Sequence, residues 1–430
     1  MLLSLPFWLY QMLRHGKYRR GFAQRLGSVP ARLAIPIPSE PIIWVHAVSV
    51  GEVLAVSGLI EQMRRRFPQH AIFVTTTTDT GQQLARNRFG EANVFYFPLD
   101  FAFAVRPYLR ALRPELVVIA ETEFWPNFLR LAHVSGARIA VVNARISDRS
   151  WPNYRRFRWL LKEELKNVDL FLAQTAEDGA RLESVGAAPN RVQVTGNLKF
   201  DLNLPPAPPI VADLRASLAE SAAGPVLVCG STVDGEEPLL LKAFENILVA
   251  HPRAVMILAP RHPERFDTVA ALLTQMELPF QRRSLWINGN SEIENTPNLA
   301  GGVLLVDTIG ELAALYALAD VAFVGGSLVP HGGHNIIEPA QHGVAIVVGN
   351  HTENFRDIVS LFQSRDAIRI VGMAELPLAL MDLLAHPAER AALGQRAAET
   401  MRSQTGATQR TVEAIENLLA GSHELGTKLN

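Results

Sequence analysis

The chain has 430 residues, more than one hydrophobic core usually serves, so two domains are expected. Hydrophobic residues make up 48% and charged residues 19%, a balance that excludes an intrinsically disordered chain. With 41 basic and 42 acidic residues the net charge is −1, so no nucleic-acid partner is predicted. Any charged ligand would have to bind at a local patch of opposite charge. The single cysteine, Cys229, excludes a disulfide framework, and its apolar neighbours predict a buried structural thiol.

Residues 1–30 are predicted to be a membrane-associated segment. The apolar run MLLSLPFWLYQML precedes a basic stretch with Arg14, Lys17, Arg19, Arg20 and Arg25, and no acidic residue occurs before Glu40. Thirteen residues rise only ~20 Å as a helix, less than the ~30 Å hydrocarbon core of a bilayer. This order favours a segment that dips into one leaflet with its arginines on anionic headgroups. A helix packed on the protein's own body, or the end of a longer anchor, stays open.

The first half of the chain alternates short β-rich runs with helical patterns, which predicts a parallel sheet covered on both faces. The helical patterns include residues 52–66 and 154–167. The expected strands are 42–47, 71–76, 93–98, 115–120, 138–143, 169–174 and 191–196.

After the proline-rich linker DLNLPPAPP (201–209) the pattern restarts, and from about residue 388 it predicts one long terminal helix that packs back toward the first domain. The expected strands are 225–230, 254–260, 302–307, 320–326, 344–349 and 367–372. The sequence therefore predicts an α/β protein with two doubly wound, Rossmann-like domains, residues 31–204 and 205–430, that face a central cleft.

Carboxylates follow two strands that we expect to be neighbours in the first domain. With the common strand order 3-2-1-4-5, strands 42–47 and 115–120 meet at the switch point where ligands bind. Glu52 follows the first strand, and Glu121 and Glu123 follow the second. A single acid at a helix start needs no function beyond complementing the helix macrodipole. Acids after both strands instead favour a functional site. We also expect the helix start to keep Glu52 ionised. His46, inside the first strand, is read as a packed side chain rather than a cleft contact.

The second domain carries a glycine-rich stretch, GGSLVPHGGHNIIEPAQHG (325–343), directly after an expected strand. Its glycines would let the backbone pass close to a ligand, and a helix expected to start near Asn335 would offer free N–H groups to an anion. Glu338 would accept hydrogen bonds from ribose hydroxyls. A rival interpretation makes His331, His334 and Glu338 a metal site, but the glycines and the proline break the helix that such ligands usually share.

Other strand ends of the second domain carry similar chemistry. Arg261 and His262 suit a phosphate or carboxylate, Gly310 and Glu311 begin a further expected helix, and residues 230–232 (GST) follow the first strand. Together they predict a nucleotide-phosphate cradle. No GxGxxG, P-loop or Asp-x-Asp pattern occurs, which disfavours a dinucleotide dehydrogenase, a P-loop kinase and metal-dependent sugar transfer, so no metal or cofactor is predicted.

Six motifs, WVHAVSVGE, ETEFWPN, NARISDRS, TGNLKFD, PRHPERF and GGHNIIEPA, resemble those of the 3-deoxy-D-manno-octulosonic acid (Kdo) transferases, GT-B glycosyltransferases of lipopolysaccharide synthesis. The match spans about residues 40 to 360 in the family's order and spacing. The resemblance implies inverting transfer of Kdo from CMP-Kdo to the lipid A precursor (lipid IVA) at the cytoplasmic face of the inner membrane. The first domain would then take the acceptor and the second the donor.

The resemblance also implies residue roles. Glu52 is the expected catalytic base. Glu123 and Lys199 are expected to stabilise the transition state, with Glu121 the second choice for the glutamate. Without an anionic ligand, Lys199 would more often be a plain surface lysine. The implied nucleotide-binding residues are Arg261, His262, Ile309, Gly310, Glu311, Asn335, Ile336, Ile337 and Glu338. The stretch RSWPNYRRF (149–157) is either a docking patch for the anionic lipid or a solvated helix face. A nucleotide-sugar epimerase or lipid A disaccharide synthase, and a catalytically silent nucleotide-sugar or lipid-binding protein, are the alternatives.

Overall fold

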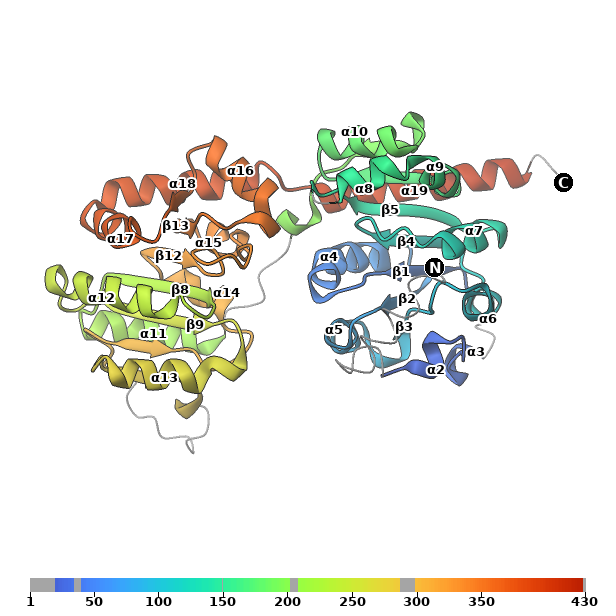
Figure 1. Cartoon of the computed structure of the whole chain (residues 1–430). Helices are drawn as coiled ribbons and strands as arrows, with labels where there is room; N and C mark the ends of the chain where they lie inside the picture. The colour runs from blue at the N-terminus through green and yellow to red at the C-terminus, as the bar shows by residue number, and fades with distance from the viewer. Residues whose placement is uncertain (1–19, 35–39, 149, 202–207, 287–297, 428–430) are drawn as a thin grey trace. The chain divides into compact units, whose positions relative to one another are not determined.

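The computed structural model describes residues 20–34, 40–148, 150–201, 208–286 and 298–427, with side chains through residue 420. The chain divides into two compact units, one formed by residues 1–203 and 404–430 and the other by residues 204–403 (Figure 1). Each unit is built on a seven-stranded parallel sheet, so the expected α/β architecture is confirmed.

The first sheet has the strand order β3-β2-β1-β4-β5-β6-β7, which confirms that the strand ending at His46 and the strand ending at Ala120 are neighbours. All five residues of β1 are buried, as expected of a central parallel strand. The strands are β1 (Ile42–His46), β2 (Ala71–Thr76), β3 (Val94–Tyr96), β4 (Leu116–Ala120), β5 (Arg138–Ala144), β6 (Leu170–Ala173) and β7 (Val192–Val194).

Two helical layers cover this sheet, each with its own apolar core. One layer holds α3 (Ala31–Ala34), α6 (Ala102–Leu112), α7 (Pro126–Val134), α8 (Trp151–Arg156), α9 (Arg158–Leu165) and α10 (Ala176–Val185), with α2 (Phe22–Arg25) beside α6. The other holds α4 (Val50–Arg66), α5 (Asp79–Phe89) and α19 (Ala407–Thr427). The single helix expected over 154–167 is in fact two, because the chain leaves helical geometry at Phe157.

The second sheet has the order β10-β11-β9-β8-β12-β13-β14, so its switch point lies between β8 and β12. The strands are β8 (Val226–Thr232), β9 (Val255–Pro260), β10 (Phe280–Arg282), β11 (Val303–Leu305), β12 (Val321–Val324), β13 (Ala345–Gly349) and β14 (Arg369–Val371). The helices are α11 (Pro209–Glu220), α12 (Glu237–Ala250), α13 (Phe266–Gln275), α14 (Leu312–Leu315), α15 (Ile337–Gln341), α16 (Arg356–Ser364), α17 (Leu376–Ala385) and α18 (Pro387–Arg402). Cys229 is fully buried in β8, as predicted.

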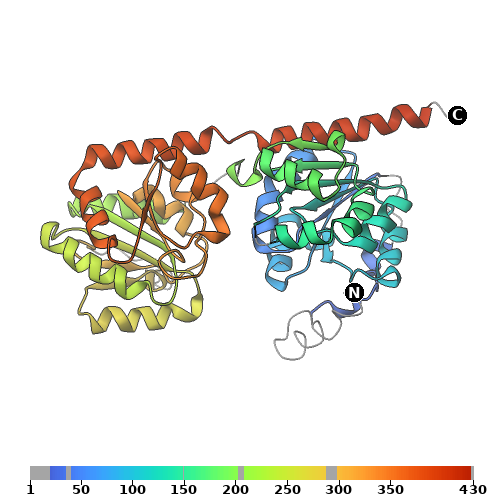
Figure 2. The same cartoon turned by 45° about the horizontal axis from the view of Figure 1, so that its top comes forward.

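The C-terminal segment differs from the single long helix that the sequence predicts. Helix α18 ends at Arg402 and α19 begins at Ala407, with Gly406 at φ 91° between them. The carboxylate of Asp201 accepts hydrogen bonds from the backbone N–H groups of Gly406 (2.7 Å) and Thr408 at the start of α19. Helix α19 then packs along α4, so residues 404–430 belong to the first unit (Figure 2).

The N-terminal basic stretch is only partly a surface feature. Residues 1–19 of the predicted membrane-associated segment lie outside the described residues, and none of the described helices is both long and apolar enough to span a membrane. The Arg25 side chain is 2% exposed, its Nη2 donates to the Thr77 carbonyl (2.7 Å), and its guanidinium lies 4.3 Å from the Tyr96 ring centroid. The expectation that Arg25 contacts lipid headgroups is therefore wrong, because this arginine is used inside the unit.

Candidate active site

The turn between β1 and α4 fixes Glu52 by hydrogen bonds. Ser49 is the N-cap of α4, and its hydroxyl accepts the backbone N–H of Glu52 (3.5 Å) and donates to Glu52 Oε1 (3.0 Å). Glu52 Oε2 accepts the backbone N–H of Val48 (2.8 Å). This reciprocal arrangement is a variant of the capping box, and it holds a buried carboxylate at the carboxyl end of the central strand.

The structure brings Glu121 and Glu123 close enough to Glu52 to affect its ionisation. Burial, and then the charge of Glu121, raise the pKa of Glu52 to about 8; Glu123 adds to the rise, and the bonds from Val48 and Ser49 oppose it. Burial and the Glu121 charge likewise raise the pKa of Glu123. The expectation that the helix start keeps Glu52 ionised is wrong, because desolvation and like charges outweigh the helix terminus here.

Lys199 lies beside this acidic cluster. It belongs to a single 3-10 turn, Leu198–Asp201, and its Nζ is 3.4 Å from Glu121 Oε1. Asn143 Oδ1 accepts the backbone N–H of Leu198 (3.0 Å) and so fixes the turn against the end of β5. Of the two glutamates in ETE, the one that contacts Lys199 is Glu121, which has the unusual left-handed φ of 56°.

His46 is a packed side chain, as predicted. Its ring is fully buried, stacks on Phe97 with centroids 3.8 Å apart, and uses Nδ1 to donate to the Thr75 carbonyl (3.2 Å). Burial lowers its pKa to about 3, so the imidazole is neutral at physiological pH.

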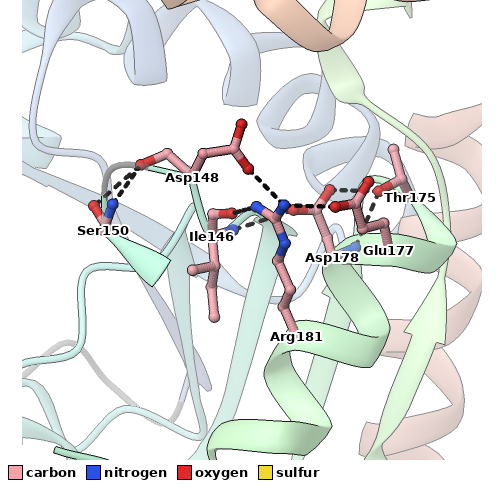
Figure 3. Close-up of polar contacts among 8 residues, drawn as sticks. Ile146, Asp148, Ser150, Thr175, Glu177, Asp178 and Arg181 are labelled. Atoms are coloured by element: carbon pink, nitrogen blue, oxygen red, sulfur yellow. Dashed lines mark hydrogen bonds and ion pairs between the residues drawn. The ribbon is translucent and has the colours of Figure 1, made fainter. Parts of the chain in front are cut away.

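Sequence reasoning missed the residue that fixes the NARISDRS loop. Arg181 of α10 donates to the Ile146 carbonyl (2.6 Å) and forms ion pairs with Asp148 and Glu177 (both 2.5 Å), as Figure 3 shows. The neighbouring Asp178 accepts the backbone N–H of Ile146 (3.1 Å). This arginine lies more than thirty residues from the loop, so no local pattern could have revealed the contact.

The same loop leads into α8, which contacts the acidic cluster through a tyrosine. The Tyr154 hydroxyl donates to the Thr122 carbonyl (3.3 Å), between the two glutamates of ETE, and its pKa is raised by burial and by the Glu123 charge. On the other side, Tyr154 lines a groove of about 460 Å³. The remaining lining residues are Ser150, Asn153, Phe157, Leu160 and Leu161. This apolar groove is thus one side chain away from the carboxylates.

In the second unit, a buried glutamate joins the two strand ends at the switch point. The Glu236 carboxylate accepts four backbone N–H groups, from Val233 (3.0 Å), Gly326 (2.7 Å), Ser327 (2.9 Å) and Leu328 (2.9 Å). It therefore ties the turn after β8 to the turn after β12. The sequence pattern singled out the glycines of this stretch but missed Glu236.

The glycines themselves pack tightly against the protein. A Cβ on Gly325 would lie 2.5 Å from the Ser231 carbonyl oxygen, and one on Gly332 would lie 2.3 Å from the Asn354 side chain. Close approach to the backbone thus requires glycine at position 325, and a φ of 94° favours glycine at position 332, in both cases independently of any ligand.

Several predicted nucleotide-binding residues gather near this edge. The positive charge of Arg261 acts on both His334 and Glu338, and Asn335 Nδ2 donates to Glu338 Oε1 (3.2 Å). Burial, followed by the charges of Arg261, His331 and His262, lowers the pKa of His334 to about 4, while burial raises that of Glu338. The cluster is therefore predominantly basic.

The other predicted nucleotide-binding residues differ in which groups they leave available to a ligand. Ile336 and Ile337 are buried in the core, so only their backbone is available to a ligand, and the N–H of Ile337 already donates to Asn335 Oδ1 (3.1 Å). Ile309 is 81% exposed and Gly310 has a φ of 97°. Glu311 is held by an ion pair with Arg283 (2.7 Å) and by the Thr308 hydroxyl. The helices expected here are short, since α14 and α15 have only four and five residues.

The rival metal set of His331, His334 and Glu338 does not converge. Within the described part of the chain, the one trio of potential ligands at metal-binding spacing is Asp382, His386 and Glu389. Arg369 forms ion pairs with two of its members, Asp382 (3.2 Å) and Glu389 (2.6 Å), so a guanidinium already neutralises that site.

Comparison with known proteins identifies the family. Residues 20–202 match the family model described as 3-deoxy-D-manno-octulosonic-acid transferase (kdotransferase). The chain is 38% identical over 436 residues to the 3-deoxy-D-manno-octulosonic acid transferase of Bordetella pertussis, covering 96% of this chain and 95% of that protein. It is 33% identical over 406 residues to the Haemophilus influenzae enzyme of the same name, covering 94% and 92%. The chain belongs to the Kdo transferase family.

The resemblance inferred from the motifs is thereby confirmed, and this family member is a glycosyltransferase. Among solved structures, a putative UDP-N-acetylglucosamine 2-epimerase from Listeria monocytogenes aligns over 89% of this chain with a TM-score of 0.57 and 13% identity. The UDP-GlcNAc 2-epimerase of Neisseria meningitidis aligns over 88% with the same TM-score and 12% identity. At such identities these likenesses concern the fold alone, which is of the GT-B type.

Proposed function

We propose that this Kdo transferase moves Kdo from CMP-Kdo to the lipid A precursor lipid IVA, with inversion at the anomeric carbon. The observation that carries the proposal is the acidic cluster at the switch point of the first sheet, where Glu52 has a pKa of about 8. A general base works best when its pKa lies near the operating pH. Glu52 therefore combines basicity with a fixed position at the end of β1.

In the proposed reaction Glu52 removes the proton from the acceptor hydroxyl. The hydroxyl oxygen forms a bond to the anomeric carbon of Kdo, the bond from that carbon to the phosphate oxygen breaks, and CMP leaves with the electron pair. Lys199, held 3.4 Å from Glu121, supplies positive charge near the acids, and Glu123 helps to stabilise the transition state. We assign Glu121 the separate task of orienting Lys199.

The donor nucleotide is assigned to the basic cluster of the second unit. Arg261 provides a planar guanidinium for the phosphate, His262 is a further donor, and Glu338 with Asn335 is available to ribose hydroxyls. The backbone of residues 309–311 and 335–338 completes the proposed nucleotide site.

The acceptor is assigned to the first unit, where the groove beside Tyr154 offers an apolar lining next to the carboxylates. Arg155 and Arg156 on α8 are exposed and available to the acceptor's phosphates. We place the enzyme at the cytoplasmic face of the inner membrane, attached peripherally or through residues 1–30.

Mass spectrometry of lipid IVA after incubation with the full chain and CMP-Kdo tests the proposal. We expect the mass of the acceptor to increase by one or more Kdo units, with CMP released only when both substrates are present. Turnover of UDP-linked sugars without any Kdo transfer would contradict the proposal, as would nucleotide binding without transfer.

A further inference from the structure

Most of one helical layer of the first unit carries charge of a single sign, whereas the later part of α9 and all of α10 also contain acidic residues. Helices α2, α3, α6, α7 and α8 contain no aspartate or glutamate, and together with the first turn of α9 we call them the acid-free layer. Its exposed basic residues are Arg32, Arg106, Arg110, Arg130, Arg155, Arg156 and Arg158. Helices α4, α5 and α19, on the opposite face of the sheet, contain acidic residues among their basic ones. The net charge of −1 conceals this asymmetry.

The acid-free layer also exposes large hydrophobic side chains. Trp159 is 70% exposed and Phe103 is 62% exposed. The other members are Phe22, Leu26, Val134, Phe157 and Leu160. Among the described residues of the first unit, Val194 is the one exposed large hydrophobic residue that lies elsewhere. Apolar and basic side chains are therefore interleaved on the same surface, as in the run RRFRWL (155–160).

The basic residues of α6 are available to a partner. Phe103, Arg106 and Arg110 follow at spacings of three and four and so form one stripe on the helix. Neither arginine forms an ion pair with a carboxylate in the described part of the chain. The stripe thus presents unneutralised charge beside an exposed aromatic ring.

We propose that the acid-free layer docks on an anionic phospholipid bilayer, with its aromatic side chains at the level of the headgroups. Interleaved arginine and aromatic residues match an interface that is negatively charged at its surface and apolar beneath. A purely polar polyanion would leave Trp159 and Phe103 without a favourable environment. The course of the chain agrees with this occupant, because the predicted membrane-associated residues 1–19 lead directly into α2, at one edge of this layer.

This inference rests on the proposed function, which places the enzyme at the membrane. It adds which surface of the chain contacts the bilayer. It also explains the location of the groove beside Tyr154, which is lined by Phe157 and Leu160 of the same layer. An acylated acceptor would reach the acidic cluster without leaving the bilayer side of the unit.

Site-specific fluorescence on the full chain separates this surface from the N-terminal tether. Cys229 is buried, so a single new cysteine in Phe103→Cys or Trp159→Cys can carry an environment-sensitive dye, with Arg65→Cys on α4 as the control. On vesicles that contain phosphatidylglycerol we expect a blue shift at positions 103 and 159 but none at 65. Vesicle binding without any shift at 103 and 159 would overturn the proposal.

A charge-reversal pair tests the electrostatic part. The double variant Arg106→Glu/Arg110→Glu should bind phosphatidylglycerol vesicles about tenfold more weakly at low salt. The control is Arg65→Glu/Arg88→Glu, which changes the net charge by the same amount on the opposite face of the sheet. This control should have little effect on vesicle binding. Equal partition of the two variants would refute the charge argument. Transfer to detergent-solubilised acceptor should be retained by the Arg106/Arg110 variant, which also shows that it is folded. Absence of transfer in every protein, wild type included, would refute the proposed function instead.

Discussion

The carboxyl edges of the two sheets each contain a switch point, and the two edges differ in charge. In the first unit the switch point between β1 and β4 gathers Glu52, Glu121 and Glu123, and burial among like charges raises the pKa of Glu52 to about 8. In the second, burial and neighbouring positive charges lower the pKa of His334 to about 4. Both groups are driven toward their neutral forms by the same physics with opposite signs. The fold thus determines where a site lies, and the residues after each strand determine which ligand charge it accepts.

The strongest test of this contrast removes the base from the acidic edge. Glu52→Gln keeps the shape of the side chain and an acceptor for the Val48 N–H, but it cannot take a proton, so transfer should fall by about 10²–10⁴-fold. CMP binding, assigned to the other unit, should change less than about twofold. Turnover assays and calorimetry measure the two quantities. Substantial residual transfer would show that another group is the base.

Lys199, the cation that contacts the acidic edge, should come next in effect. Lys199→Met removes the charge that lies 3.4 Å from Glu121, and we expect transfer to fall by about 10²-fold, with partial recovery in Lys199→Arg. Turnover assays measure the loss, and a variant with an unchanged rate would exclude Lys199 from the site.

On the basic edge, Arg261→Ala should weaken CMP binding by roughly tenfold, because a charge-assisted hydrogen bond to phosphate is lost. The pKa of His334 should rise, since Arg261 is one of the charges that lower it. Calorimetry and NMR titration measure these changes. The exposed Arg215→Ala in the same unit is the matched control, and equal affinities in both variants would contradict the assignment.

The last prediction concerns the stability of the fold rather than its activity. The pKa of Glu52 is about 8 in the folded chain and 4.5 as its model value, so the folded state holds this proton more tightly. The free energy of unfolding should therefore fall as the pH rises from about 5 to 8. Glu52→Gln lacks this titration and should be more stable than the wild type at pH 8 by about 1–3 kcal/mol. Parallel denaturation curves for the two proteins across this range would contradict the raised pKa.

Strand positions were predictable because each long strand is a continuous apolar run that local sequence reveals. The exception is β10, a three-residue edge strand in which Gln281 and Arg282 hide the pattern. The convergence of Glu52 with Glu121 and Glu123 followed from strand order alone. The direction of the Glu52 pKa shift could not be predicted from strand order, because it depends on burial, which no local sequence pattern reveals. The Arg181 contacts and the Asp201 cap join residues far apart in the chain, so they needed the fold to become visible.

The Asp201 cap has a consequence for how the molecule can be divided. Because residues 404–430 complete the first unit, the second unit is an insertion within it rather than an appended domain. A fragment that stops at residue 203 would lose α19 and expose the apolar surface that Val412, Ile415 and Leu419 cover. Residues 204–403, in contrast, form one uninterrupted stretch. The contiguous module of this chain is therefore the inserted one, and its host is a single compact unit encoded in two separate pieces.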